Sequence, residues 1–107
     1  MRNINANELA AWLDDESRVS PLLLDVREPW EYQICHIDGS RTMPMSTIPT
    51  NVAELDQDQP IVCICHHGMR SMQVALFLEQ QGFSDVINLT GGVDAWATQV
   101  DSGMATY

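Results

Sequence analysis

The chain has 107 residues, of which 45% are hydrophobic and 19% charged, a balance typical of one globular domain and unlike a disordered segment. Its 15 acidic and 5 basic residues give a net charge of −10, which argues against nucleic acid or an anionic membrane as a partner. No apolar run has the length of a transmembrane helix, and the first residues lack the apolar centre of a signal peptide, so we expect a single domain over residues 1–107 located in the cytoplasm.

The first half of the chain alternates between helical and strand patterns. The N-terminal residues read as the start of a helix, because Asn5 and Glu8 have the spacing of a capping box and an apolar stripe follows from Leu9. The apolar run at 21–26 predicts a strand buried on both faces. The next expected elements are a short helix opening near Pro29, a turn at 36–40, irregular chain at 43–49 and a short helix at 52–55.

The second half continues the alternation. It predicts a buried strand at 60–65, a helix at 71–81 with Met72, Ala75, Leu76 and Leu78 on its apolar face and Gly82 at its end, a strand at 85–89 and a helix at 93–98. The tail at 100–107 has no clear pattern. Alternating strands and helices indicate a parallel sheet covered on both faces, in which functional sites lie beyond the carboxyl ends of the strands.

The segment that follows the strand at 60–65 carries the residues best suited to chemistry. Cys65 ends that strand, and Gly68 permits a positive φ that would let successive N–H groups point toward the thiol as an anion-binding nest. The N-terminus of the next helix and Arg70 add positive charge. All three features favour the thiolate, so the segment predicts a cysteine that attacks an anionic electrophile.

Four motifs resemble those of the rhodanese domain, a single-domain sulfurtransferase. They are Leu24-Asp25-Val26-Arg27 with Glu31-Tyr32, His36-Ile37-x-Gly39-Ser40, Cys65-x-x-Gly68-x-Arg70-Ser71, and Gly91-Gly92-x-x-x-Trp96. In this order they cover nearly the whole chain. The resemblance implies an α/β fold, a three-layer α/β/α sandwich around a mainly parallel five-stranded sheet.

The same resemblance implies a reaction and its residues. Cys65 would take sulfane sulfur from a small anionic donor such as thiosulfate, or from a persulfide, and hold it as a Cys65 persulfide. A thiophilic acceptor would remove it: cyanide in vitro, a low-molecular-weight thiol or a sulfur-acceptor protein in the cell. No cofactor is required. The expected donor-binding residues are His66, His67, Gly68, Met69 and Arg70 through their backbone N–H groups, Arg70 also through its side chain, and Ser71 as a helix cap or a donor to the sulfur.

Two other functions stay open at this point. In related phosphatases and arsenate reductases, one more residue lies between the cysteine and the arginine, which enlarges the cradle for a tetrahedral oxyanion. Only four residues separate Cys65 from Arg70, which is the sulfurtransferase length. A non-catalytic interaction or sensor module on the same fold would be indicated by a lost cysteine or a broken loop, and here Cys65 and the loop are both present.

The residues outside the loop have structural interpretations. Asp25 and Arg27 are expected to support the fold, with Arg27 bonded to a nearby carboxylate for which Glu31 is a candidate. Cys63 is expected to be a small buried residue. Cys35 replaces the glycine most often found in the family and is expected to be a spare thiol rather than a second sulfur carrier.

A metal site is not expected, although Cys63, Cys65 and the two histidines supply soft ligand types. On a strand, Cys63 and Cys65 share one face while His66 points to the other, and the spacing matches no common zinc module. His66 and His67 are expected to be exposed residues that shape access for the acceptor, with proton transfer as an alternative role.

Overall fold

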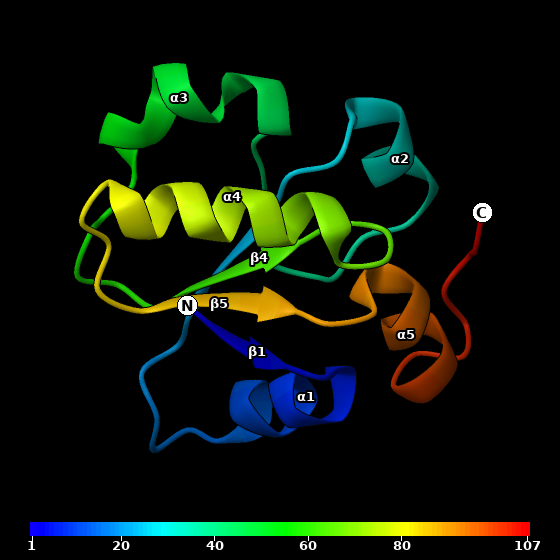
Figure 1. Cartoon of the computed structure of the whole chain (residues 1–107). Helices are drawn as coiled ribbons and strands as arrows, with labels where there is room; N and C mark the ends of the chain where they lie inside the picture. Colours follow the sequence, from blue (N-terminus) through cyan, green and yellow to red (C-terminus); the bar gives the residue numbers. More distant parts are fainter.

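A parallel five-stranded sheet with the strand order β1-β5-β4-β2-β3 forms the centre of the computed structural model, which describes residues 1–107 (Figure 1). The strands are β1 (Arg2–Ile4), β2 (Leu22–Asp25), β3 (Arg41–Thr42), β4 (Ile61–Ile64) and β5 (Val86–Leu89). The α-helices are α1 (Ala6–Asp14), α2 (Pro29–Ile34), α3 (Ile48–Asn51), α4 (Met69–Gln80) and α5 (Gly92–Gln99), with single 3-10 turns at Met45–Thr47 and Val52–Glu54. None of these helices combines the length and the apolar character needed to cross a membrane.

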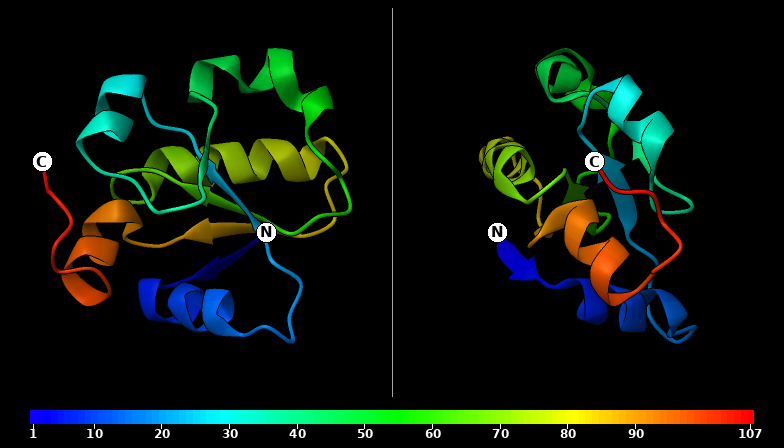
Figure 2. Two further views of the ribbon diagram at one scale, coloured as in Figure 1. Left: turned by 180° about the vertical axis from the view of Figure 1, so that it is seen from behind. Right: turned by 90° about the vertical axis from the view of Figure 1, so that its right-hand side faces the viewer.

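Alternate residues of the central strand β4 supply two separate cores. Val62 and Ile64 pack with residues of α1 and α5 on one face of the sheet, whereas Ile61 and Cys63 pack with residues of α3 and α4 on the other. The two layers of helices are visible on opposite sides of the strands in Figures 1 and 2. This burial on both faces is why the strand reads as an uninterrupted apolar run, and it confirms the expected α/β sandwich.

The sequence pattern found the three inner strands but missed the two outer ones. The strands expected near 21–26, 60–65 and 85–89 are confirmed as β2, β4 and β5. The N-terminal residues were expected to begin a helix, yet residues 2–4 form β1 beside β5 before α1 begins. Strands of three and two residues at a sheet edge are too short to show a period, which is why β1 and β3 were not found.

The local helix signals are confirmed at α1 and shifted at α4. Asn5 and Glu8 form the capping box, with hydrogen bonds of 2.8 and 3.0 Å between side chain and backbone. Helix α4 begins two residues earlier than expected, at Met69, and ends before Gly82, whose φ is +94°. Its buried row is Ser71, Val74, Ala75 and Leu78, while the expected core residues Met72 and Leu76 are exposed. The expected helix at 52–55 is a 3-10 turn that continues α3.

Candidate active site

The loop between β4 and α4 lies at the carboxyl edge of the sheet, where the arrows of β4 and β5 point in Figure 1. The start of α5 holds this loop through its backbone. The N–H of Val93 donates to the carbonyl of Cys65 at 3.0 Å, and the N–H of Asp94 donates to the carbonyl of His66 at 3.1 Å. Gly92 permits this contact, because a Cβ at this position would collide with both carbonyl oxygens. The first two residues of the loop are therefore fixed against α5.

The sulfur of Cys65 is buried and accepts a backbone hydrogen bond. The residue is only 1% exposed, and the N–H of Gly68 donates to its Sγ at 3.0 Å. Gly68 has a φ of +107°, and a Cβ there would meet Gly91 N and Leu89 O at 3.3 Å, so both conformation and space favour glycine. The conformation predicted for Gly68 is confirmed.

The remaining N–H groups of the loop make no hydrogen bond to the sulfur. Of the donors predicted on His66, His67, Gly68, Met69 and Arg70, only the N–H of Gly68 contacts Sγ. Because α4 begins at Met69, the N–H groups of its first turn have no acceptor inside the helix and give this end a partial positive charge. The loop therefore offers one direct donor and a helix terminus to an anion at Cys65.

Ser71 contacts the sulfur from inside α4 and is held by a residue that the sequence reading missed. Its Oγ lies 3.3 Å from the Sγ of Cys65, and its hydroxyl donates to the Oδ1 of Asn88 at 2.5 Å. The Nδ2 of Asn88 donates in turn to the carbonyl of Gly68 at 3.3 Å. The N-cap of α4 is Gly68, so the first of the two roles expected for Ser71, a helix cap, is wrong. The second role, donation to the sulfur, stays a prediction. A lone amide inside an apolar strand was the available signal for Asn88.

Arg70 does not present a free positive charge. Its Nη1 and Nη2 donate to the two carboxylate oxygens of Glu31 at 2.7 and 2.9 Å. These bonds are the main reason why the pKa of Glu31 falls to about 2, and they raise the pKa of Arg70. The sequence predicted a full positive charge available to donor oxygens, whereas packing of α2 against the loop supplies a carboxylate that neutralises it.

Arg27 and Asp25 form a second, wholly buried ion pair. The Arg27 Nε and Nη2 donate to Asp25 at 2.9 and 2.7 Å, and Nη2 also donates to the carbonyl of Cys35 at 2.7 Å. The expected bond between Arg27 and a nearby carboxylate is confirmed, but the carboxylate is Asp25. The candidate Glu31 supplies only its backbone carbonyl, at 3.3 Å. The pair joins the end of β2 to α2, a structural position.

Tyr107 brings the C-terminal tail into the same network. Its hydroxyl donates to Glu31 at 2.7 Å and accepts from Arg27 at 3.0 Å. Its ring stacks on His66, with centroids 3.9 Å apart, and meets the edge of Trp30 at 5.9 Å. Burial is the main reason why the pKa of Tyr107 rises to about 12, so the group stays a phenol that can donate. The tail had no sequence pattern, and no local signal pointed to this contact.

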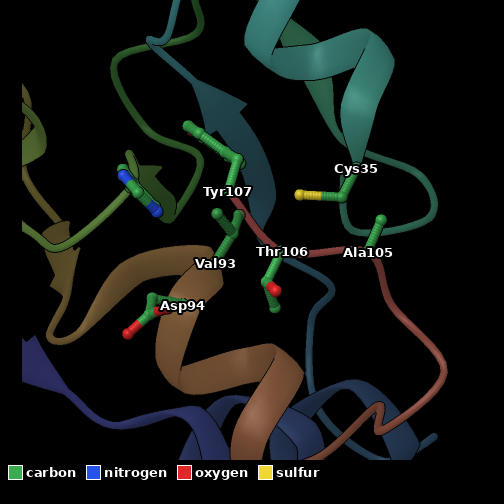
Figure 3. A pocket seen from close by; sticks show the side chains of 7 residues that line it. Cys35, Val93, Asp94, Ala105, Thr106 and Tyr107 are labelled. Atoms are coloured by element: carbon green, nitrogen blue, oxygen red, sulfur yellow. The ribbon is translucent and has the colours of Figure 1, made fainter.

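Figure 3 shows how the tail passes the site: Ala105 lies beside Cys35, and Thr106 and Tyr107 follow near Val93 and Asp94 of α5. The recess between them is too narrow to admit a water molecule. Cys35 is 8% exposed, and Cys63 is wholly buried, which raises the pKa of its thiol to about 12. The expected burial of Cys63 is confirmed, and all three cysteines are free.

The two histidines differ in their surroundings. His66 is half-buried between His67 and Tyr107, and its pKa is lowered by burial first and by His67 second. His67 is exposed, with its Nδ1 3.8 Å from the Oδ2 of Asp94. Ligand atoms of His66, His67 and Asp94 come within 4.8 Å of one another. Tetrahedral zinc requires neighbouring ligands about 3.4 Å apart, so these side chains would have to move closer to hold it.

The pair between Glu31 and Arg70 predicts an acid-sensitive contribution to stability. Because the pKa of Glu31 falls from 4.5 to about 2 on folding, its contribution is complete above about pH 4.5 and is lost as the pH falls through about 2. We expect Glu31→Gln to lower the free energy of unfolding by about 1–3 kcal/mol at pH 7 and by less at pH 3. Urea unfolding at both pH values measures this difference.

Glu16→Gln is the matched control, because Glu16 is an exposed carboxylate without an ion pair. Its effect on the free energy of unfolding should be within about 0.5 kcal/mol at either pH. If Glu31→Gln lowers the free energy of unfolding equally at pH 7 and pH 3, Glu31 stabilises the fold through packing alone.

Comparison with known proteins gives the chain its family. Residues 5–99 match the Rhodanese-like domain family. The chain is 38% identical over 95 residues to the thiosulfate sulfurtransferase GlpE of Pseudoalteromonas translucida, covering 89% of this chain and 88% of that protein. It is also 40% identical over 106 residues to the probable adenylyltransferase/sulfurtransferase MoeZ of Mycobacterium tuberculosis, covering 97% of this chain but only 26% of that longer protein.

The fold agrees with these matches. The crystal structure of a rhodanese-like domain protein from Staphylococcus aureus superposes with a TM-score of 0.84 at 30% identity, and the match covers 100% of this chain and 99% of that one. It confirms the α/β sandwich that the four motifs implied. The family match, the identity to a relative of similar length and the shared fold show that this chain belongs to the Rhodanese-like domain family.

Proposed function

We propose that this protein transfers sulfane sulfur from a donor such as thiosulfate or a persulfide to a thiophilic acceptor, through a persulfide on Cys65. The observation that carries the proposal is the position of Cys65 at the end of β4, with the Gly68 N–H 3.0 Å from its sulfur and only four residues between it and Arg70. Relatives named thiosulfate sulfurtransferase support the same class of reaction.

The reaction has two displacement steps at sulfur. The Cys65 thiolate attacks the outer sulfur of the donor, a new S–S bond forms, and the bond inside the donor breaks. The leaving group, sulfite in the case of thiosulfate, departs with the electron pair. The acceptor then attacks the outer sulfur of the persulfide and regenerates the thiolate. Neither step needs a cofactor, and neither changes the total number of electrons.

The surroundings of Cys65 suit an anionic sulfur. The Gly68 N–H and the first turn of α4 stabilise negative charge on Sγ or on the sulfur that it carries. A persulfide lengthens the side chain by about 2 Å, which brings the transferable sulfur outward from a residue that is itself buried. We infer that the acceptor is cyanide in an assay and a small thiol or a sulfur-acceptor protein in the cell.

Intact mass spectrometry tests the proposal directly. After incubation with a sulfane-sulfur donor, the protein should gain the mass of one sulfur atom, and peptide mapping should place it on Cys65. Addition of cyanide should remove the sulfur and form thiocyanate. No mass gain from thiosulfate, a thiosulfonate or a persulfide would contradict the proposal, and release of phosphate from an aryl phosphate ester would indicate the phosphatase alternative.

A further inference from the structure

We propose that the site prefers organic sulfane-sulfur donors with at most one negative charge near the reacting sulfur, such as persulfides and thiosulfonates, over the dianion thiosulfate. This inference rests on the proposed transfer through Cys65 and names the class of donor. It follows from the charges fixed around the loop and from the lining of the recess next to Arg70.

The cations near the loop are already neutralised. Arg70 forms a bidentate pair with Glu31, which also accepts from the hydroxyl of Tyr107. Because Tyr107 holds the second oxygen of Glu31 in place, the carboxylate has little freedom to move away and release Arg70. Arg27 is wholly buried against Asp25. A dianion that reaches the thiolate therefore meets no unpaired guanidinium.

Carboxylates outnumber guanidinium groups around this loop. The carboxylates are Asp25, Glu28, Glu31 and Asp94, and the guanidinium groups are Arg27 and Arg70. The rest of the chain reinforces this sign, with a net charge of −10. The backbone N–H groups and the terminus of α4 supply only partial charge. The cost of bringing a donor to the thiolate should therefore rise with the negative charge of the donor.

The recess beside Arg70 offers space for a carbon group. It has a volume of about 290 Å³ and is lined by Val26, Glu28, Met45, Ser46, Pro49 and Arg70. Three of these six residues present hydrocarbon or thioether surface, and Glu28 places a carboxylate at the recess. Cys65 does not line this recess, so an organic group attached to the donor sulfur would reach it past Arg70, without desolvating a second negative charge.

Sulfur transfer from either donor class is chemically balanced. With a persulfide R–S–SH, the Cys65 thiolate attacks the terminal sulfur and forms a new S–S bond. The S–S bond of the donor breaks, the thiolate R–S⁻ leaves with the electron pair, and the proton stays on the new persulfide. With a thiosulfonate, the leaving group is a sulfinate. The donor sulfur is neither oxidised nor reduced by an outside reagent, so no further reactant is required.

Thiosulfonates provide matched probes, because they differ from thiosulfate by one carbon group in place of one charged oxygen. The experiment compares thiosulfate, methanethiosulfonate and benzenethiosulfonate as donors with cyanide as acceptor, at constant ionic strength. We expect a higher kcat/KM for both thiosulfonates than for thiosulfate, with benzenethiosulfonate the better of the two because its ring can enter the recess. A higher salt concentration should reduce the difference in kcat/KM between the thiosulfonates and thiosulfate, because it screens the repulsion between the donor and the carboxylates.

Two variants test whether the charges around the loop cause the donor preference. Glu31→Gln frees the charge of Arg70, so kcat/KM should rise about tenfold for the dianion and about threefold for the monoanions, in proportion to donor charge. Glu28→Gln removes an exposed negative charge at the recess. It should raise kcat/KM by about threefold for thiosulfate and by less than about twofold for the thiosulfonates. If the buried Glu31 variant does not fold, Glu28→Gln and the salt dependence still carry the test.

The outcomes separate the two proposals. The inference about donor charge would be overturned if all three donors load Cys65 and thiosulfate has the highest kcat/KM. It would also be overturned if each variant changes kcat/KM equally for all donors. Either result leaves the proposed sulfur transfer intact. Loading from none of the three donors, and none from a low-molecular-weight persulfide, would overturn the proposed function, and the inference with it.

Discussion

Cys65→Ser is expected to lower kcat/KM for sulfur transfer to cyanide by about a thousandfold or more. A serine hydroxyl stays protonated at neutral pH and cannot form a persulfide, whereas the thiolate is the attacking species. The variant should also lose the mass gain after donor treatment. Thiocyanate formation and intact mass measure both effects on the same sample.

The fold should survive this substitution, because a serine oxygen can still accept the hydrogen bond from Gly68. Cys35→Ser is the matched control: Cys35 is another nearly buried free thiol, but it follows α2 rather than β4. We expect Cys35→Ser to load sulfur at a rate within about threefold of the original protein, since a spare thiol takes no part in the transfer. Loss of loading in Cys35→Ser together with retained loading in Cys65→Ser would reassign the sulfur carrier.

Gly92→Ala is expected to lower the free energy of unfolding by about 3–5 kcal/mol, a large share of the 5–15 kcal/mol that holds an average domain. The added Cβ would collide with the carbonyl oxygens of Cys65 and His66. These are the acceptors of the Val93 and Asp94 N–H groups, so relief of the collision would separate α5 from the loop and break both hydrogen bonds. Urea unfolding gives the change in stability, and sulfur loading of the folded fraction shows whether the loop has moved.

Gly39→Ala separates the collision from the backbone conformation. Gly39 has a φ of +83°, but a Cβ there would meet nothing within 4 Å. Its substitution should therefore cost only the left-handed conformation, about 1–2 kcal/mol. If Gly92→Ala costs no more than Gly39→Ala, the contact between α5 and the loop has no role in stability beyond the conformation of one residue.

The residues that form the centre of the site could be found from the sequence because each signal is local. Cys65 ends an uninterrupted apolar run, and Gly68 stands where the turn into α4 requires a positive φ of +107°. The same holds for the capping box at Asn5 and Glu8, which lie one helical turn apart. Short-range steric and hydrogen-bond requirements leave a direct mark on neighbouring residues.

The partners of the charged side chains could not be found in this way. Arg70 and Glu31 are 39 positions apart, and Tyr107 and Glu31 are 76 apart, so no spacing rule connects them. The sequence suggested Glu31 as the partner of Arg27, because both lie near one turn. Arg27 instead pairs with Asp25, two residues before it, and the Glu31 carboxylate lies against Arg70.

The sequence by itself determined the α/β architecture, the position of Cys65 at the end of a buried strand and the length of the loop that follows it. Strand burial, turn geometry and helix capping are set by residues close together in the chain, so each leaves a local pattern. Only the tertiary structure decided the electrostatic character of the site. The sequence predicted a positive pocket, but Glu31 reaches the loop from α2 and cancels the charge of Arg70, while Tyr107 of the tail holds Glu31 in place. Charge at a site depends on which distant side chains come to lie beside it, and that is fixed by how the helices and the tail pack.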